Sequence, residues 1–179
     1  MNTALEKPCG ISDWLHMYVL YRKAFPASER KPFGIIRKMY RQGRTDVWCI
    51  RRSGKFCGFA STVNGNDLIL LDYLAVLPEC RGKGVGSASM ALLREQYGNK
   101  GLFVEIESTL EDGPDQRERE KRKQFYQNAG LEPLGVYARV FGVNMELLGA
   151  GCFLKFADYR YFYREHYSPW AAEHLEPLE

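Results

Sequence analysis

The stretch that most constrains this chain joins an apolar run to a glycine-rich turn and then to a helix-forming segment. Residues 68–76 read LILLDYLAV, residues 81–86 read RGKGVG, and residues 87–97 carry helix-forming side chains. Glycines at alternate positions let the main chain approach a ligand closely, while Arg81 and Lys83 add positive charge beside them. Such a turn at the start of a helix is typical of a site that binds an anion, commonly a phosphate.

A further strand is predicted at Leu102–Ile106, after Gly98 ends the helix. Strand, turn, helix and strand form a β-α-β unit, so the strands at 68–76 and 102–106 are expected to be parallel neighbours. Ligands of such units bind where the first strand ends and the helix begins. The glycine-rich turn lies at this point.

Hydrophobic periodicity and turn residues divide the rest of the chain into helices and strands. Before the unit we expect a helix that Ser12 and Asp13 cap and Pro26 ends, a helix from Pro32 to about Gly43, and strands at Asp46–Arg52 and Lys55–Val63. After the unit we expect a helix at Arg117–Ala129, strands at Leu134–Phe141 and Val143–Leu148, and an aromatic tail at Phe153–Tyr167. Strands joined by hairpin-type turns predict an antiparallel meander ahead of the β-α-β unit.

Length and composition favour a single domain over residues 1–179, since 179 residues that are 45% hydrophobic can bury one sizeable core. The formal charge of +3 is too small to indicate a nucleic-acid partner. Five cysteines without a C-x-x-C pair and three scattered histidines predict neither a disulfide framework nor a metal site. No signal peptide and no apolar run of roughly 20 residues is present, so we expect a cytoplasmic protein without a membrane partner.

Two common phosphate-binding motifs do not fit the turn. The dinucleotide fingerprint G-x-G-x-x-G would need glycine where Ser87 stands, and the triphosphate loop would need Ser or Thr where Gly84 stands. Arg81-x-x-Gly84-x-Gly86 instead resembles the R/Q-x-x-G-x-G/A loop that binds acetyl-coenzyme A in the GNAT superfamily of N-acetyltransferases. RKQFYQNAGL, in which Tyr126 precedes Gly130 by four residues, resembles the second signature of that superfamily.

The resemblance implies an α/β (α+β) fold, with a mixed, mostly antiparallel central sheet, a β-α-β unit for acetyl-coenzyme A, and helices on both faces. It also implies an acetyl-coenzyme A-dependent enzyme that acetylates a primary amine of a small molecule or peptide. The residues expected to contact the coenzyme are Leu74, Ala75, Val76, Arg81, Gly82, Lys83, Gly84, Val85, Gly86, Ser87 and Tyr126.

Catalysis of this kind needs a base that deprotonates the amine and an acid that protonates the leaving thiolate. The resemblance implies that Tyr126 is the acid, although a core aromatic beside Phe125 is the alternative. Glu105 and Glu107 project from one face of a strand and are candidate bases, or they neutralise a nearby arginine. Glu29, in a loop between prolines, is a third candidate that could bind the substrate ammonium or relay its proton; the alternative is a solvated carboxylate paired with Arg30.

Three further expectations concern polar groups near these candidates. Asp72 lies in an apolar strand and needs a hydrogen-bonding partner if it is buried, so we expect it to be structural support. Glu118 and Arg122 are spaced as an i,i+4 ion pair on a solvated helix. The superfamily often has asparagine where Arg119 stands, and its histone acetyltransferases have their glutamate base where Leu70 stands, which disfavours histone-type chemistry.

Two alternatives remain open at this stage. A coenzyme-binding sensor or interaction module could keep the fold without turnover. The aromatic tail could close the core or form the surface of a homodimer.

Overall fold

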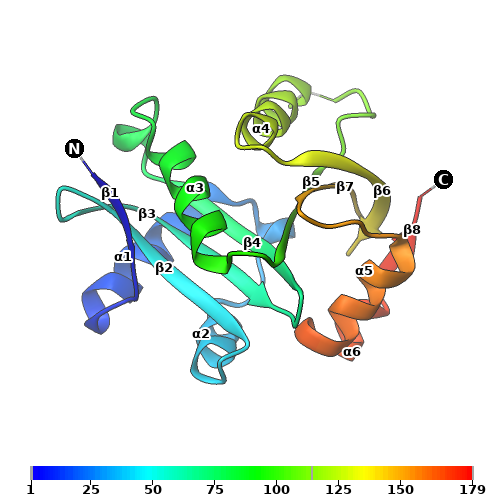
Figure 1. The fold of residues 1–179 in the computed structure, drawn as a ribbon, viewed down its shortest axis with the longest axis horizontal. Coiled ribbons are helices and arrows are strands. Elements are labelled where there is room, and N and C mark those ends of the chain that lie inside the picture. Colours follow the sequence, from blue (N-terminus) through cyan, green and yellow to red (C-terminus); the bar gives the residue numbers. More distant parts are fainter. Residues whose placement is uncertain (1, 114, 179) are drawn as a thin grey trace. The chain divides into compact units, whose positions relative to one another are not determined.

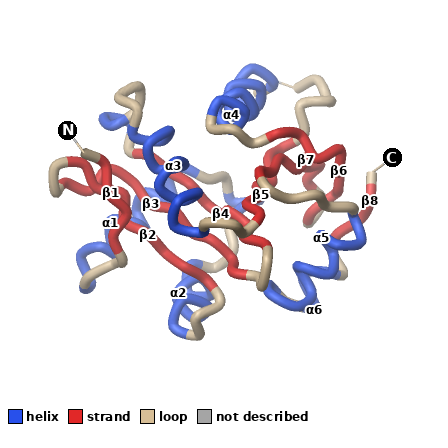
Figure 2. The backbone as a smooth tube through the Cα atoms, viewed as in Figure 1, coloured by secondary structure: helices blue, strands red, loops and turns tan. Residues whose placement is uncertain are grey.

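A computed structural model describes residues 2–113 and 115–178 (Figure 1). The helices are α1 (Gly10–Ala24), α2 (Phe33–Arg41), α3 (Val85–Tyr97), α4 (Gln116–Asn128), α5 (Phe156–Phe162) and α6 (Pro169–Ala172). The strands are β1 (Thr3–Glu6), β2 (Thr45–Arg52), β3 (Lys55–Asn64), β4 (Leu68–Val76), β5 (Gly101–Glu107), β6 (Glu132–Val140), β7 (Val143–Ala150) and β8 (Leu175–Pro177). Figure 2 shows how helices and strands alternate along the backbone.

The strands form an eight-stranded sheet of order β1-β2-β3-β4-β5-β7-β6-β8. The pairs β1–β2, β2–β3, β5–β7, β6–β7 and β6–β8 are antiparallel. The mixed fold with a mostly antiparallel sheet is therefore confirmed, as is the meander of β2, β3 and β4. β4 and β5, the two strands of the predicted β-α-β unit, follow one another in the strand order.

The chain divides into two compact units, and neither is a continuous piece of sequence. The first unit comprises Met1–Asn64 and Leu71–Gly98, and the second comprises Gly65–Leu70 and Asn99–Glu179. The boundary passes through β4, whose first three residues belong to the second unit. Each unit has its own buried side chains.

In the first unit, helices cover both faces of the strands. One cluster joins α1 and α2 to the sheet through residues such as Tyr21, Ile36 and Phe59. A second cluster joins Val85 of α3 to Ile50 of β2, with further apolar side chains of β4 packed against it. Successive strand residues point to opposite faces, so an almost uninterrupted apolar strand can supply both clusters.

The start of α1 differs from the predicted cap. The N-cap residue is Cys9, and the side chain of Ser12 does not cap the helix, which already begins at Gly10. The buried carboxylate of Asp13 accepts a hydrogen bond from the Cys9 amide at 2.8 Å and pairs with Arg51 at 2.6 Å. Burial alone would raise the pKa of Asp13, but the amide and the guanidinium outweigh it and lower that pKa.

In the second unit, the aromatic tail is helical and closes the core. Phe103 of β5 packs edge-to-face against Phe162 at 5.1 Å and against Tyr159 at 6.3 Å, both from α5. Tyr159, Phe162 and Tyr163 are buried, whereas Tyr161 is exposed. Their spacing of three and four residues is the helical signal that the sequence already carried.

The predicted strands of the second unit are confirmed as β6 and β7. They turn at Phe141 and Gly142, both of which have positive φ, as a two-residue hairpin loop of this type requires. The short strands β1 and β8 and the helix α6 were not predicted, because three or four residues carry little periodicity. In the part of the chain that the structure describes, no helix is both long and apolar enough to cross a bilayer.

Candidate functional site

The glycine loop, residues 81–86, turns from the end of β4 into α3. Gly82 has φ of 69° and Gly84 has φ of 74°, a left-handed conformation that other residues adopt only with strain. Gly84 is the N-cap of α3. The helix therefore starts at Val85, two residues before the predicted start, and Ser87 lies in its first turn.

The first turn of α3 offers main-chain amides to a ligand. The first amides of an α-helix have no acceptor within the helix, and no side chain caps this one. Ala88 is the first residue of this helix whose amide makes a helical hydrogen bond; it donates to the Gly84 carbonyl at 3.0 Å. The amides of Val85, Gly86 and Ser87, together with the positive end of the helix dipole, suit an anion.

Three cations brace or flank the glycine loop. Arg81 Nε donates to the Val76 carbonyl at 3.0 Å, and Lys83 Nζ donates to the Glu79 carbonyl at 2.7 Å. Arg52, which the sequence analysis missed, donates from Nη1 to the Lys83 carbonyl at 2.9 Å. No local signal could have identified Arg52, because it lies 31 residues from its partner.

The strand that leads into the loop alternates between buried and partly exposed residues. Along β4, Asp72, Leu74 and Val76 are partly exposed, whereas Tyr73 and Ala75 between them are buried. Since side chains alternate along a strand, the three partly exposed residues share one side. Leu74 and Val76 are therefore partly exposed on either side of the buried Ala75, immediately before the glycine loop.

Asp72 has the partner that its burial requires. Its carboxylate pairs with Lys31 Nζ at 2.5 Å, and the exposed fractions of the two side chains are 7% and 11%. Lys31 lies in the loop between α1 and α2, two residues after Glu29. Glu29 ends a 3₁₀ turn, and its main-chain carbonyl accepts a hydrogen bond from the Tyr73 hydroxyl at 2.9 Å.

Tyr126, the predicted acid, lies in the second unit on α4. Its side chain is 7% exposed and packs edge-to-face on Phe125 at 5.1 Å. Burial raises the pKa of Tyr126 to about 12. Its hydroxyl makes no hydrogen bond to another residue within 2–113 and 115–178, so the proton is not committed to a protein acceptor.

The two predicted bases on β5 have different partners. Glu105 accepts a hydrogen bond from the Tyr159 hydroxyl at 2.6 Å and another from the Tyr163 hydroxyl at 3.0 Å. Burial, and then the charge of Glu105, raises the pKa of Tyr159. Glu107 instead pairs with Arg122 at 3.4 Å, as the alternative of a neutralised arginine predicts.

The charged helix α4 differs from the predicted pairing. Glu118 pairs with Lys121 at 2.7 Å rather than with Arg122, which reaches Glu107, so the predicted i,i+4 pair is wrong. Arg119 is buried, and its Nη1 donates to the Ser108 carbonyl at 2.7 Å. Arg119 therefore braces the loop after β5.

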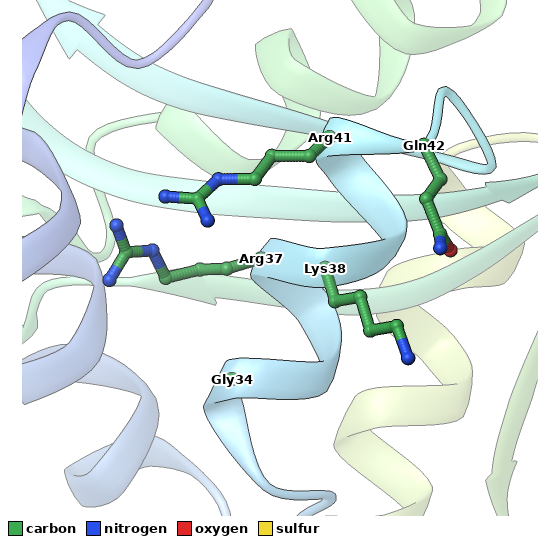
Figure 3. A pocket seen from close by; sticks show the side chains of 5 residues that line it. All are labelled: Gly34, Arg37, Lys38, Arg41 and Gln42. Carbon is green, nitrogen blue, oxygen red and sulfur yellow. The ribbon is translucent and has the colours of Figure 1, made fainter.

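A cavity of about 420 Å³ lies on α2, lined by Gly34, Arg37, Lys38, Arg41 and Gln42. Figure 3 shows that Arg37 and Arg41 extend to one side of the helix, while Lys38 and Gln42 extend to the other. None of its three cations pairs with a carboxylate of a described residue. The cavity therefore suits anionic groups and is unsuited to the ammonium group of an amine.

The described residues contain no group of three or more His, Cys, Asp and Glu side chains that could hold a metal ion. Residues 14–117 match the sequence model of the Acetyltransferase (GNAT) family, a match that includes both strands of the β-α-β unit and the loop. A comparison with curated protein sequences found no match.

Solved structures with this fold include several acetyltransferases. An acetyltransferase of the GNAT family from Bacteroides thetaiotaomicron has a TM-score of 0.76 at 17% identity, covering 96% of this chain and 99% of that one. An aminoglycoside 6'-N-acetyltransferase complexed with coenzyme A has a TM-score of 0.67 at 13% identity, covering 84% and 96%. The ribosomal-protein-S18-alanine N-acetyltransferase of Escherichia coli has a TM-score of 0.59 at 16% identity, covering 86% and 96%.

Proposed function

Because this chain belongs to the GNAT family of acetyltransferases, we propose that it transfers the acetyl group of acetyl-coenzyme A to a primary amine of a small molecule or peptide. Acetyl-coenzyme A, the acyl donor of the family, supplies an activated thioester carbonyl. In the balanced reaction, an ammonium loses two protons, its nitrogen bonds to the acetyl carbon, and the carbon–sulfur bond breaks. The thiolate takes up one proton, so one proton is released overall.

The observation that carries this proposal is the uncapped first turn of α3 behind two left-handed glycines. The coenzyme is polyanionic through its phosphates, and the amides of Val85, Gly86 and Ser87 supply donors that suit a pyrophosphate. Arg81 and Lys83 add positive charge to the same loop. Leu74–Val76, at the end of β4, would lie along the rest of the coenzyme, and a main-chain amide there would donate to the developing oxyanion.

We assign the proton transfers to side chains whose local environments are compatible with these roles. Tyr126 is the acid, since it retains its proton at neutral pH and its hydroxyl is not occupied by a described protein acceptor. A glutamate is the base, with Glu105, Glu107 and Glu29 as the candidates. Glu105 is held by two hydroxyls and Glu107 by one guanidinium, so removing each carboxylate separately can rank them.

A glycine substitution tests the coenzyme site directly. We expect Gly84→Ala to weaken acetyl-coenzyme A binding by about ten-fold or more, because an alanine at φ of 74° strains the loop by about 1–2 kcal/mol and disturbs the amides. Isothermal titration calorimetry measures this change. The matched control is Gly43→Ala, at φ of 71° beyond the end of α2, where an added Cβ also meets nothing within 4 Å.

Gly43→Ala should lose comparable stability and keep the affinity of the wild type. If Gly84→Ala binds as tightly as Gly43→Ala, the loop is not the coenzyme site. If the wild type binds the coenzyme but releases no thiol with any of a broad panel of amines, the chain is a coenzyme-binding sensor rather than an enzyme.

A further inference from the structure

The Lys31–Asp72 ion pair is buried in the first unit although its members are 41 residues apart. Lys31 reaches from the loop between α1 and α2 to the middle of β4. The pair therefore brings a primary ammonium into contact with a carboxylate. This is the contact that an amine acceptor would make with a recognition residue.

The loop that carries Lys31 is held by its main chain, independently of the lysine side chain. The Tyr21 hydroxyl donates to the Lys31 carbonyl at 2.9 Å, and the Tyr73 hydroxyl donates to the Glu29 carbonyl at 2.9 Å. Pro26 and Pro32 restrict the backbone on either side. Removing the lysine side chain should leave the loop in place and open a space where the lysine ammonium contacts Asp72.

Stability alone does not account for this pair. Desolvating two charges offsets most of their attraction, so a buried ion pair is often no more stabilising than two apolar side chains of similar size. Tyr73, whose ring lies near Lys31 Nζ, belongs to an apolar and aromatic cluster. A contribution to stability therefore does not by itself require charges at this place.

The position of Asp72 fits an acceptor site. Asp72 lies on β4, two residues or about 7 Å along the strand before Leu74, the first of the strand residues expected to contact the coenzyme. The ring of Tyr73 lies 5.4 Å from Lys31 Nζ. A carboxylate beside an aromatic ring is the chemistry that binds an alkylammonium ion.

We propose that Asp72 binds the ammonium group of the acceptor, and that the side chain of Lys31 fills this ammonium site until an acceptor displaces it. This inference rests on the proposed acetyltransferase function and specifies its acceptor as a cationic alkylamine. The lysine acts as an internal competitor. It raises the acceptor KM by the reciprocal of the fraction of time for which Lys31 leaves Asp72 vacant.

Chemical rescue of Lys31→Ala tests the site without the coenzyme. The substitution removes the carbon chain and ammonium that n-propylammonium contains, and it leaves Asp72 buried without this cation, which lowers the unfolding temperature. We expect n-propylammonium chloride to raise that temperature more than tetramethylammonium chloride does at equal ionic strength, because only the primary ammonium can donate hydrogen bonds. The wild type and the double variant Lys31→Ala/Asp72→Asn should show no such difference.

The matched control is Lys123→Ala, which breaks the ion pair of Lys123 with Glu146 in the second unit. Glu146 keeps two hydrogen bonds from Thr109, at 3.0 Å and 2.7 Å, so its vacated carboxylate should respond less to n-propylammonium. An equal response of both variants, or none in Lys31→Ala, would overturn the proposal. If Lys31→Ala folds only when an alkylammonium salt is present, that dependence supports an ammonium site at Asp72.

Kinetics provide the second arm, which does not depend on rescue. With an alkylamine acceptor, Lys31→Ala should lower the acceptor KM by about ten-fold if the lysine fills the site about nine-tenths of the time. Asp72→Asn should raise the acceptor KM while calorimetry shows unchanged acetyl-coenzyme A binding. An unchanged acceptor KM in both variants refutes the ammonium site, whereas a wild type that binds no coenzyme refutes the proposed function and leaves the rescue result standing.

Discussion

Tyr126 shows how burial decides what a single side chain can do. Desolvation raises the pKa of its phenol to about 12, above the value of about 10 for an exposed tyrosine. A raised pKa keeps the proton bound, so this side chain stabilises the fold fully below pH 10 and loses that contribution as the pH rises toward 12. The same shift keeps Tyr126 protonated throughout the neutral and mildly alkaline range, which its proposed role as the acid requires.

We expect Tyr126→Phe to lower kcat by about ten-fold or more, because the thiolate would leave without its proton donor. Thermal unfolding should be unchanged, since the ring remains. The pH profile of kcat in the wild type should show no decline from ionisation of Tyr126 below about pH 11. Tyr137→Phe, on β6 of the same unit, is the control; if both variants keep full kcat, Tyr126 is only a core aromatic.

At the scale of elements, the contact between β5 and the aromatic segment that begins with α5 combines packing with hydrogen bonding. Phe103 packs on α5, and two residues along the same strand Glu105 accepts hydrogen bonds from Tyr159 and Tyr163. Tyr163 begins the π-helical turn Tyr163–Tyr167 that follows α5. One carboxylate thus fixes two consecutive elements of the tail to the strand.

We expect Glu105→Gln to destabilise the protein by about 2 kcal/mol, because charge-assisted hydrogen bonds from two buried hydroxyls weaken when the acceptor becomes neutral. Glu107 pairs with Arg122 at 3.4 Å, and both side chains are partly exposed. Glu107→Gln should therefore change the free energy of unfolding by less than about 1 kcal/mol. Urea denaturation monitored by fluorescence measures both. Equal losses in the two variants would contradict the structural role of Glu105.

Across the whole molecule, the two units are interleaved in sequence. The chain passes from the first unit to the second at residue 65, returns at residue 71, and leaves again at residue 99. Neither unit can therefore be excised as a continuous segment, although each has its own core. The match to the family model also runs through residues of both units.

Because β4 belongs to both units, we expect calorimetry to show a single unfolding transition. At a concentration of 100 times its Kd, the coenzyme should raise the free energy of unfolding by about 2.7 kcal/mol. The whole transition should therefore move to a higher temperature. Differential scanning calorimetry with and without acetyl-coenzyme A makes the measurement. Two transitions, of which only one moves, would show instead that the units unfold independently.

The sequence alone determined the features that depend on neighbouring residues. Hydrophobic periodicity, helix-ending glycines and hairpin turns gave the elements from α1 to β7 to within a few residues, and the spacing of Arg81, Gly84 and Gly86 gave the glycine loop. These signals are local, because φ, ψ and side-chain alternation are set within a few residues. The same reason explains why the three- and four-residue elements near the termini were missed.

The tertiary structure decided which polar groups meet. The sequence predicted that Asp72 needs a partner, but only folding identified Lys31, 41 residues away, and only folding placed Tyr159 and Tyr163 on Glu105, 54 and 58 residues away. Arg52 at the glycine loop is a third example. Packing of the chain determines which buried polar groups come within hydrogen-bonding distance of one another. Local sequence patterns carry no information about contacts between residues this far apart.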